Sequence, residues 1–325
     1  MSLVCAFDNT VHEDRDALHG HLKRFRVSRE KYYHTYSPKH DPVTNELIPF
    51  KSYDQYVNAD FASKITLKKW LMDNPEKGFQ WAKDWLSKRK EAKDLVYAPS
   101  QVELRTLCCP SMPYFDEIGS AEGGYYQICR TLGFHDRYTA VNPIFVPLSA
   151  DATIIQDTRE QTPITFTLPM REEALGVGDY ALAPPHDLTI RIERKSIGDF
   201  CGTLSGRKMT RKGKTRTTEW DNLTRFDKEL ARAVEANLYV VMMVEGSITE
   251  AQSINFLPQY KWIKASSDYL FHNLRALLVK YPLHFQAVFV DTRKHSMADK
   301  IQRVFEMGES IKTCDLQYLY ERGLL

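Results

Sequence analysis

The sequence contains no long hydrophobic run. Its longest unbroken apolar segment is Leu238–Val244, whereas a helix needs about 20 apolar residues to span a bilayer. Near the N-terminus, the apolar stretch Leu3–Phe7 is ended by Asp8, which leaves it too short for a secretory signal peptide. We therefore expect a chain with no membrane segment that stays in the cytoplasm where it is made.

The cysteine content and the net charge are also low. The six cysteines among 325 residues have no repeated spacing and form no C-x-x-C pair, which argues against a secreted disulfide framework. The 44 lysines and arginines are balanced by 42 acidic residues. This balance excludes a histone-like basic surface but allows a local basic patch. No G-x-x-x-x-G-K-[ST] motif occurs, so no nucleotide cofactor is expected.

The composition is that of a globular protein with enough apolar material for a core, since 43% of residues are hydrophobic. Pro143 and Pro147 exclude a continuous helix over residues 141–152, and we place a domain boundary there. The prediction is a mainly helical N-terminal domain at 1–145, an α/β domain at 150–310, and a tail at 311–325.

Hydrophobic spacing predicts the elements of both domains. In the first domain we expect helices over 15–26, 28–36, 62–72, 76–92 and 100–107, with an irregular stretch at 109–127. In the second we expect strands over 153–157, 174–183, 188–195, 238–244 and 284–290, and helices over 197–204, 220–236, 267–280 and 296–307. Alternation of this kind predicts a mixed sheet between layers of helices.

Acidic residues and one lysine lie at the expected strand ends: Asp157, Asp179, Glu193 and Lys195. Because strand side chains alternate faces, Glu193 and Lys195 should share a face while Arg194 points away. Carboxylates from neighbouring strands form a hard oxygen site for Mg²⁺ or Mn²⁺, and Lys195 could orient a water for phosphodiester hydrolysis. Taken alone, a Glu-x-Lys spacing on a strand is more often a solvated surface pair.

The surrounding residues resemble the signature of XPF-type nucleases, G-D-x(n)-E-R-K-x-x-x-D. The matching segments are D-T-R-E at 157–160, G-D-Y at 178–180 and E-R-K-S-I-G-D at 193–199. The similarity covers roughly residues 153–305, about half of the chain. It implies a restriction-endonuclease-like fold and a metal-dependent endonuclease that cuts branched or flapped DNA, as in DNA repair.

The resemblance also implies roles for individual residues. Asp157, Asp179 and Glu193 would coordinate or position Mg²⁺ or Mn²⁺, and Lys195 would be the catalytic lysine. The supporting motif positions would be Arg159, Glu160, Arg194 and Asp199.

For three of these supporting positions another role is open. Ser196-x-x-Asp199 is also a capping box that would begin the next helix, and Arg194 could be structural or pair with Asp199. Glu160 is either a further acidic ligand or negative charge in the first turn of a helix.

The chain departs from the family after its last expected helix, because too few residues remain for a tandem helix-hairpin-helix domain. The resemblance therefore predicts the DNA structure and the oligomeric state less directly than it predicts the chemistry. For the oligomeric state, a homodimer through the nuclease domain is possible. The alternatives are a catalytically silent DNA-binding or scaffold subunit, and a restriction-type or single-strand nuclease. A standalone nuclease of this kind suits a bacterium or its phage.

A basic segment at 207–216 follows the expected helix at 197–204. It holds six cations and no acid: Arg207, Lys208, Arg211, Lys212, Lys214 and Arg216. Like-charge repulsion should keep the segment extended, and we expect it to contact DNA phosphates. The alternative is an ordinary solvated loop.

The segments A-L-H-G-H-L at 17–22 and V-S-R-E-K-Y-Y at 27–33 resemble the zinc-finger-like leader of some phage-encoded nucleases and DNA-binding proteins. His19 and His21 would be the histidines, but Cys5 is the only cysteine and Asp8 stands where a second might lie. A Cys₂His₂ site needs two cysteines, so we expect this leader to bind no zinc. The tyrosine- and tryptophan-rich region that follows could stack bases, although an aromatic core is the simpler interpretation.

Overall fold

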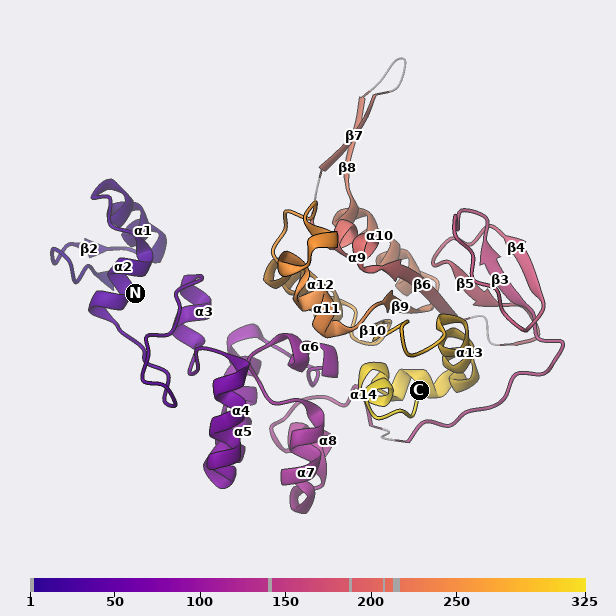
Figure 1. Cartoon of the computed structure of the whole chain (residues 1–325), viewed down its shortest axis with the longest axis horizontal. Helices are drawn as coiled ribbons and strands as arrows, with labels where there is room; N and C mark the ends of the chain where they lie inside the picture. The colour runs from indigo at the N-terminus through magenta and orange to yellow at the C-terminus, as the bar shows by residue number, and fades with distance from the viewer. Residues whose placement is uncertain (1–2, 140–141, 187–188, 207, 213–216) are drawn as a thin grey trace.

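The chain folds as an α/β protein in this computed structural model, with a helical N-terminal region followed by a six-stranded mixed sheet flanked by helices (Figure 1). The structure describes residues 3–139, 142–186, 189–206, 208–212 and 217–325, while the side chains of residue 54 and of 207–220 are outside it. Among the described residues, no helix is both long and apolar enough to cross a membrane.

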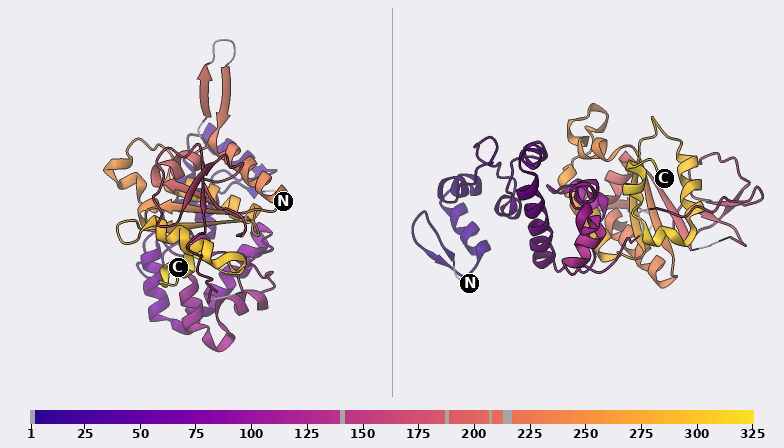
Figure 2. Two further views of the ribbon diagram at one scale, coloured as in Figure 1. Left: turned by 90° about the vertical axis from the view of Figure 1, so that its right-hand side faces the viewer. Right: turned by 90° about the horizontal axis from the view of Figure 1, so that it is seen from below.

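The first 58 residues form a separate small unit at one end of the molecule (Figures 1 and 2). Its elements are β1 (Leu3–Val4), β2 (Val11–His12), α1 (Arg15–Arg24), α2 (Arg29–Tyr36) and α3 (Tyr53–Asn58). Asp14 caps α1 and Ser28 caps α2 by accepting from backbone N–H groups in the first turn. The unit has its own hydrophobic cluster, formed by Cys5, Leu18, Leu22, Tyr32, Tyr33, Ile48 and Tyr56.

Five further helices continue the N-terminal region: α4 (Lys64–Asp73), α5 (Pro75–Lys93), α6 (Gln101–Thr106), α7 (Met112–Ile118) and α8 (Gly124–Thr131). The prediction that 109–127 is irregular was wrong, because α7 and the first half of α8 lie there. Gly119 ends α7, and Gly123 precedes α8 with a positive φ of 88°. Because glycine is typical of loops, these glycines led to the wrong prediction for two short helices, whose side chains, such as Phe115 and Tyr125, are buried.

The sheet has the strand order β10-β9-β6-β5-β3-β4. Its strands are β3 (Ile154–Asp157), β4 (Met170–Glu173), β5 (Tyr180–Leu182), β6 (Ile190–Ser196), β9 (Tyr239–Glu245) and β10 (Phe285–Val290). Strands β10, β9 and β6 are parallel, and β5 is antiparallel to both β6 and β3. The strand expected over 174–183 is limited to β5, and β4 was not expected.

Helices cover both faces of this sheet, as predicted. One face, with Val240, Met242 and Val244 of β9, packs against α9 (Ile197–Leu204), α10 (Asn222–Glu235) and α12 (Ser267–Lys280). The other face, with Val241 and Met243, packs against α13 (Met297–Met307) and α14 (Leu316–Glu321). The first of these faces also has the polar residues of the candidate site.

The end of the chain is part of the core. The residues predicted as a tail, 311–325, include α14, and their side chains at Leu316, Tyr318 and Leu319 are at most 1% exposed. Strand β10 forms an edge of the sheet, and the side-chain oxygen of Gln317 accepts the hydrogen bond of Phe289 N at 2.8 Å. An edge strand otherwise leaves such N–H groups unpaired, so α14 completes the sheet.

The basic segment forms one strand of a hairpin. Strand β7 (Lys208–Lys212) pairs antiparallel with β8 (Thr217–Asp221), and the hairpin projects away from the sheet between α9 and α10 (Figure 1). In the described part of the segment, Lys208–Lys212, the backbone is extended, as expected, and it is paired with a second strand. Residues 207 and 213–216, which include three of the six cations, lie outside the described residues.

Candidate functional site

Three carboxylates occupy one row across three neighbouring strands. Tyr180 pairs with Ile192 and with Gln156, so the antiparallel register places Asp179 opposite both Glu193 and Asp157. Backbone hydrogen bonds continue this pairing, from Asp157 N to the carbonyl of Asp179 at 2.8 Å and from Asp179 N to the carbonyl of Ile192 at 2.7 Å. Directly opposite residues on antiparallel strands point to the same face and lie close together.

Asp179, Glu193 and Lys195 form the central group of the site. Glu193 is 6% exposed, and its carboxylate forms an ion pair with the ammonium of Lys195. Burial, together with the nearby Glu193 carboxylate, raises the pKa of Asp179 to about 7, and burial raises the pKa of Glu193. Burial lowers the pKa of Lys195, but the Glu193 carboxylate outweighs it, so the net direction is upward and the ammonium stays charged.

Asp157 has a different environment although it lies in the same row. Its Oδ1 accepts hydrogen bonds from the backbone N (2.8 Å) and Nε (2.6 Å) of Arg159. Its Oδ2 accepts from Nη2 of Arg159 (3.1 Å) and from the backbone N of Leu175 (2.6 Å). With two donors on each oxygen, the carboxylate is saturated, and it would need to leave Arg159 to bind a metal ion. In this structure Asp157 therefore anchors the segment between β4 and β5 to the end of β3.

Arg194 lies on the opposite side of β6 from Lys195, as strand alternation predicts. Its Nε donates to Glu245 at 2.7 Å, and its Nη1 approaches Glu160 at 3.7 Å. Of the two alternatives for Arg194, a structural role or a pair with Asp199, these contacts agree with the first, because Arg194 pairs with Glu245 and Glu160 instead of Asp199. Glu160 is not in the first turn of a helix, since it follows β3 in a turn and accepts from Thr162 N at 2.9 Å.

Asp199 belongs to a helix cap. Ser196 is the N-cap of α9, and its hydroxyl accepts from Asp199 N at 3.1 Å while donating to the Asp199 carboxylate at 2.7 Å. The side chain is exposed. Ser196 therefore caps the helix as expected, but the Asp199 carboxylate bonds to the Ser196 hydroxyl and not to the Ser196 backbone N–H, as a capping box would require.

Glu229 and Arg225 of α10 were not predicted as site residues. Glu229 accepts a hydrogen bond from Gly178 N at 3.2 Å, and its charge acts on both Glu193 and Lys195. Arg225, one helical turn earlier, acts on Glu193. The sequence signal was the i, i+4 spacing of two polar residues beside the buried Phe226 and Leu230.

The donors of this group fit a hard divalent cation. Asp179, Glu193 and Glu229 supply carboxylate oxygens, which Mg²⁺ and Mn²⁺ prefer. Buried carboxylates that raise one another's pKa are stabilised in their charged form by an added cation. Asp179 and Glu193, without Asp157, are the residues that could hold the metal, and Glu229 lies beside them, because the oxygens of these carboxylates do not form a set of three within 4.8 Å of one another.

The N-terminal unit contains a second group of ligand-type side chains. Among the residues that the structure describes, one set of three has its ligand atoms within 4.8 Å of one another, and it consists of Cys5, His12 and His21. His19, which the sequence also suggested, instead contacts the hydroxyl of Tyr33 at 3.0 Å. His12 was not predicted, because it comes from β2 and not from the helix.

Comparison with protein-family models gave no match, and comparison with curated proteins likewise gave none. The assignments above therefore depend on the sequence and on the geometry of the chain itself.

Proposed function

We propose that this chain is a divalent-metal-dependent DNA endonuclease with a restriction-endonuclease-like domain, acting on branched, flap or fork DNA. One observation carries the proposal: Asp179 lies opposite Glu193 across β5 and β6, and Lys195 pairs with Glu193 on the same face. The resemblance of the motif around these residues to XPF-type nucleases supports DNA as the substrate and Mg²⁺ or Mn²⁺ as the cofactor.

In this mechanism Asp179 and Glu193 would hold the metal, with Glu229 beside them. A bound Mg²⁺ would stabilise charge on the phosphate and favour ionisation of a water. The ammonium of Lys195, held by Glu193, donates a hydrogen bond that orients the attacking water. The water oxygen bonds to phosphorus as the bond from phosphorus to the leaving sugar oxygen breaks. That oxygen takes up a proton and the attacking water releases one.

The other motif residues position this group. Asp157 and Arg159 hold the segment between β4 and β5 through Leu175. Arg194 takes no part in the chemistry of this mechanism, because it pairs with Glu245 on the opposite face of the sheet. The hairpin formed by β7 and β8 projects beside α9 and α10 (Figure 1), where its basic strand could contact the DNA backbone.

The test is cleavage of single-stranded, duplex, flap and fork DNA with Mg²⁺ and with EDTA. We expect metal-dependent cutting, strongest on flap or fork DNA, that Asp179→Ala and Glu193→Ala both abolish while DNA binding is retained. Glu172→Ala, an exposed acid on β4 of the same sheet, is the matched control. Undiminished cutting by the two site variants would refute the assignment, and binding without any cutting by the parent chain would identify a silent DNA-binding subunit.

A further inference from the structure

The N-terminal unit is a hairpin and a helix that bring ligand-type side chains together. Cys5 follows β1, His12 ends β2, and His21 lies in α1. Their sulfur and nitrogen atoms lie within 4.8 Å of one another, although the residues span 16 positions of the sequence, from 5 to 21. Cys5 is fully buried, and both histidines are half-buried.

A carboxylate lies next to this group, although it is not one of the three residues whose ligand atoms all lie within 4.8 Å of one another. Asp8, in the turn between β1 and β2, places Oδ2 2.7 Å from Nε2 of His21. The hydroxyl of Thr10 contacts Nε2 of His12 at 2.9 Å and Nε2 of His21 at 3.3 Å. The two rings are 4.6 Å apart between centroids, so their nitrogen atoms converge on one small region.

We propose that Cys5, Asp8, His12 and His21 bind one structural Zn²⁺. Zn²⁺ takes thiolate, imidazole and carboxylate ligands in tetrahedral sites, and a site with four protein ligands is typically structural. A buried thiol next to two imidazoles suits this ion better than Mg²⁺ or Ca²⁺, which prefer oxygen ligands.

The fold of the unit explains what the ion would do. Strands β1 and β2 have two residues each, and a two-stranded hairpin is marginally stable even when longer. The ligands come from both sides of the hairpin and from α1, so one ion would link the three elements. Units of this size with a small core commonly depend on such a link.

This inference reverses the expectation that the leader binds no zinc. That expectation counted cysteines in a Cys₂His₂ pattern and took His19 and His21 as the histidines. In the folded unit His12 takes the place of His19, which is buried against Tyr33 on another side of α1. Asp8 takes the place of the second cysteine.

The first experiment measures metal bound to the full chain. The protein is purified in the presence of Zn²⁺, dialysed and analysed for metal content, and we expect about one zinc per chain. Replacing Zn²⁺ with Co²⁺ should give the intense visible bands of a tetrahedral site and a thiolate charge-transfer band. Absence of bound zinc in the parent chain, or Co²⁺ spectra without a thiolate band, would overturn the proposal.

The second experiment assigns the ligands. Cys5→Ser, His12→Gln and His21→Gln should each lower zinc content at least several-fold, whereas His19→Gln, in the same helix, should retain it. Circular dichroism checks that each variant remains folded. Full zinc content in the three ligand variants, or its loss in a folded His19→Gln chain, would contradict the assignment. Asp179→Ala should keep its zinc, which separates this site from the proposed nuclease site.

Discussion

At the scale of single residues, the row of Asp157, Asp179 and Glu193 shows how one residue type takes on different roles. The hydrogen bonds from Arg159 and Leu175 outweigh burial and hold the pKa of Asp157 below its usual value. The carboxyl of Asp179 faces Glu193, and its pKa is raised. Asp157 therefore stabilises the fold in its charged form, while Asp179 and Glu193 repel each other unless a cation lies between them.

This difference predicts that the same substitution, Asp to Asn, has unequal effects on stability at the two positions. Asp157→Asn should lower the free energy of unfolding by about 1–3 kcal/mol, since it replaces an acceptor of the buried Leu175 N–H with an amide N–H₂ or weakens the contact with Arg159. Asp179→Asn should cost little in EDTA, because the amide oxygen can still accept from Arg194 N while the repulsion with Glu193 is removed. Urea unfolding at neutral pH measures both variants. A larger loss in Asp179→Asn than in Asp157→Asn would contradict these roles.

Glu229 gives a second prediction at this scale. If it supports the metal site, Glu229→Gln should reduce metal-dependent cleavage by about 10- to 100-fold, the usual effect of losing a residue next to metal ligands, with little change in the unfolding midpoint. Glu235→Gln, an exposed position on the same helix, is the control and should cut like the parent chain. Equal activity of the two variants would remove Glu229 from the site.

Strand alternation was sufficient to predict that Glu193 and Lys195 share a face and that Arg194 does not. The saturation of Asp157 and the approach of Glu229 could not be predicted in this way. Three of the four donors to Asp157 come from Arg159, two positions away, but the fourth is Leu175 N, 18 positions away, and Glu229 bonds to Gly178, 51 positions away. The period and spacing of residue types describe one helix or strand at a time, so they do not predict contacts between distant segments.

At the scale of elements, the long helices and buried strands were predicted to within a few residues because their apolar residues recur with a clear period. The misses are short or paired elements. Helices α7 and α8 are separated by glycines, and β4 is exposed along its whole length. The pairing of β7 with β8 was missed because the charge pattern of the basic segment was considered without the strand that follows it.

The contact between α14 and the sheet edge can be tested at Gln317. Gln317→Leu adds apolar surface but leaves the buried Phe289 N–H without its acceptor, which should cost about 1–3 kcal/mol of unfolding free energy. Gln302→Leu on α13, whose amide bonds only to Glu306 within the helix, is the control and should change stability by less than about 0.5 kcal/mol. Chemical denaturation of both variants checks this, and similar stabilities would mean that the edge is satisfied in another way.

The hairpin provides a prediction for DNA binding. Replacing Lys208, Arg211 and Lys212 with Thr keeps strand-forming residues in β7 but removes three charges. DNA affinity should fall, and its dependence on salt should flatten by about 0.9 in logarithmic slope for each lost phosphate contact on duplex DNA. Replacing three exposed lysines of α5 with Thr removes the same charge elsewhere: Lys77, Lys88 and Lys93. Equal slopes for the two triple variants would mean that the hairpin does not contact DNA.

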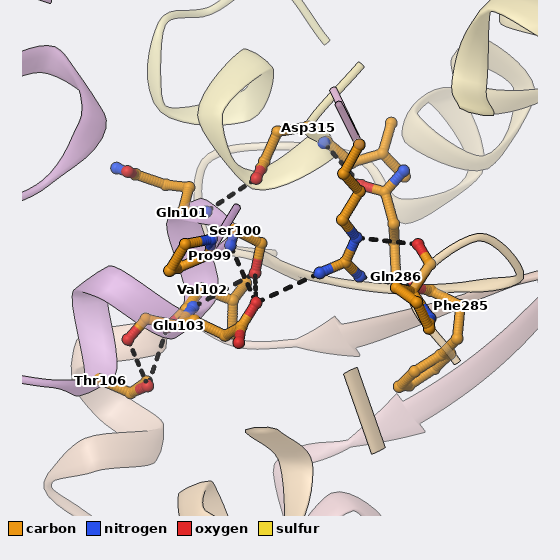
Figure 3. A network of polar contacts seen from close by, with 12 residues as sticks. Pro99, Ser100, Gln101, Val102, Glu103, Thr106, Phe285, Gln286 and Asp315 are labelled. Atoms are coloured by element: carbon orange, nitrogen blue, oxygen red, sulfur yellow. Dashed lines mark hydrogen bonds and ion pairs between the residues drawn. The ribbon is translucent and has the colours of Figure 1, made fainter. Parts of the chain in front are cut away.

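At the scale of the whole molecule, the helical region and the sheet share one hydrophobic core. The same cluster contains Leu86 of α5, Phe115 of α7 and Ile192 of β6. A buried polar network joins the same layers (Figure 3). Arg137 pairs with Glu103 at 3.2 Å, with both side chains 2% exposed, and donates to the carbonyl of Phe285. The composition change at 141–152 marked a change of secondary structure, but it could not indicate that the two halves pack into one core.

Asp315 lies in this network and links the helical region to the end of the chain. Its Oδ2 accepts from Gln101 N at 2.7 Å, and its Oδ1 accepts from Tyr318 N at 3.0 Å. Burial raises the pKa of Asp315 from 3.8 to about 6, against the effect of these hydrogen bonds and of Arg137. The folded state therefore favours the neutral carboxyl more than the unfolded state does.

The sign of the resulting pH dependence follows from this upward shift. The stabilising contribution of Asp315 is complete below pH 4, decreases as the pH rises to about 6, and is constant above that. At about 1.4 kcal/mol for each pKa unit, the decrease in the free energy of unfolding is about 3 kcal/mol.

Asp315→Asn loses one acceptor and should be less stable than the parent chain at low pH. Its stability should, however, decrease less than that of the parent chain between pH 4 and 6. Urea unfolding across this range, with the exposed Asp73→Asn as control, measures the difference. Parallel pH profiles for Asp315→Asn and the parent chain would mean that Asp315 is ionised in the folded state even at pH 4.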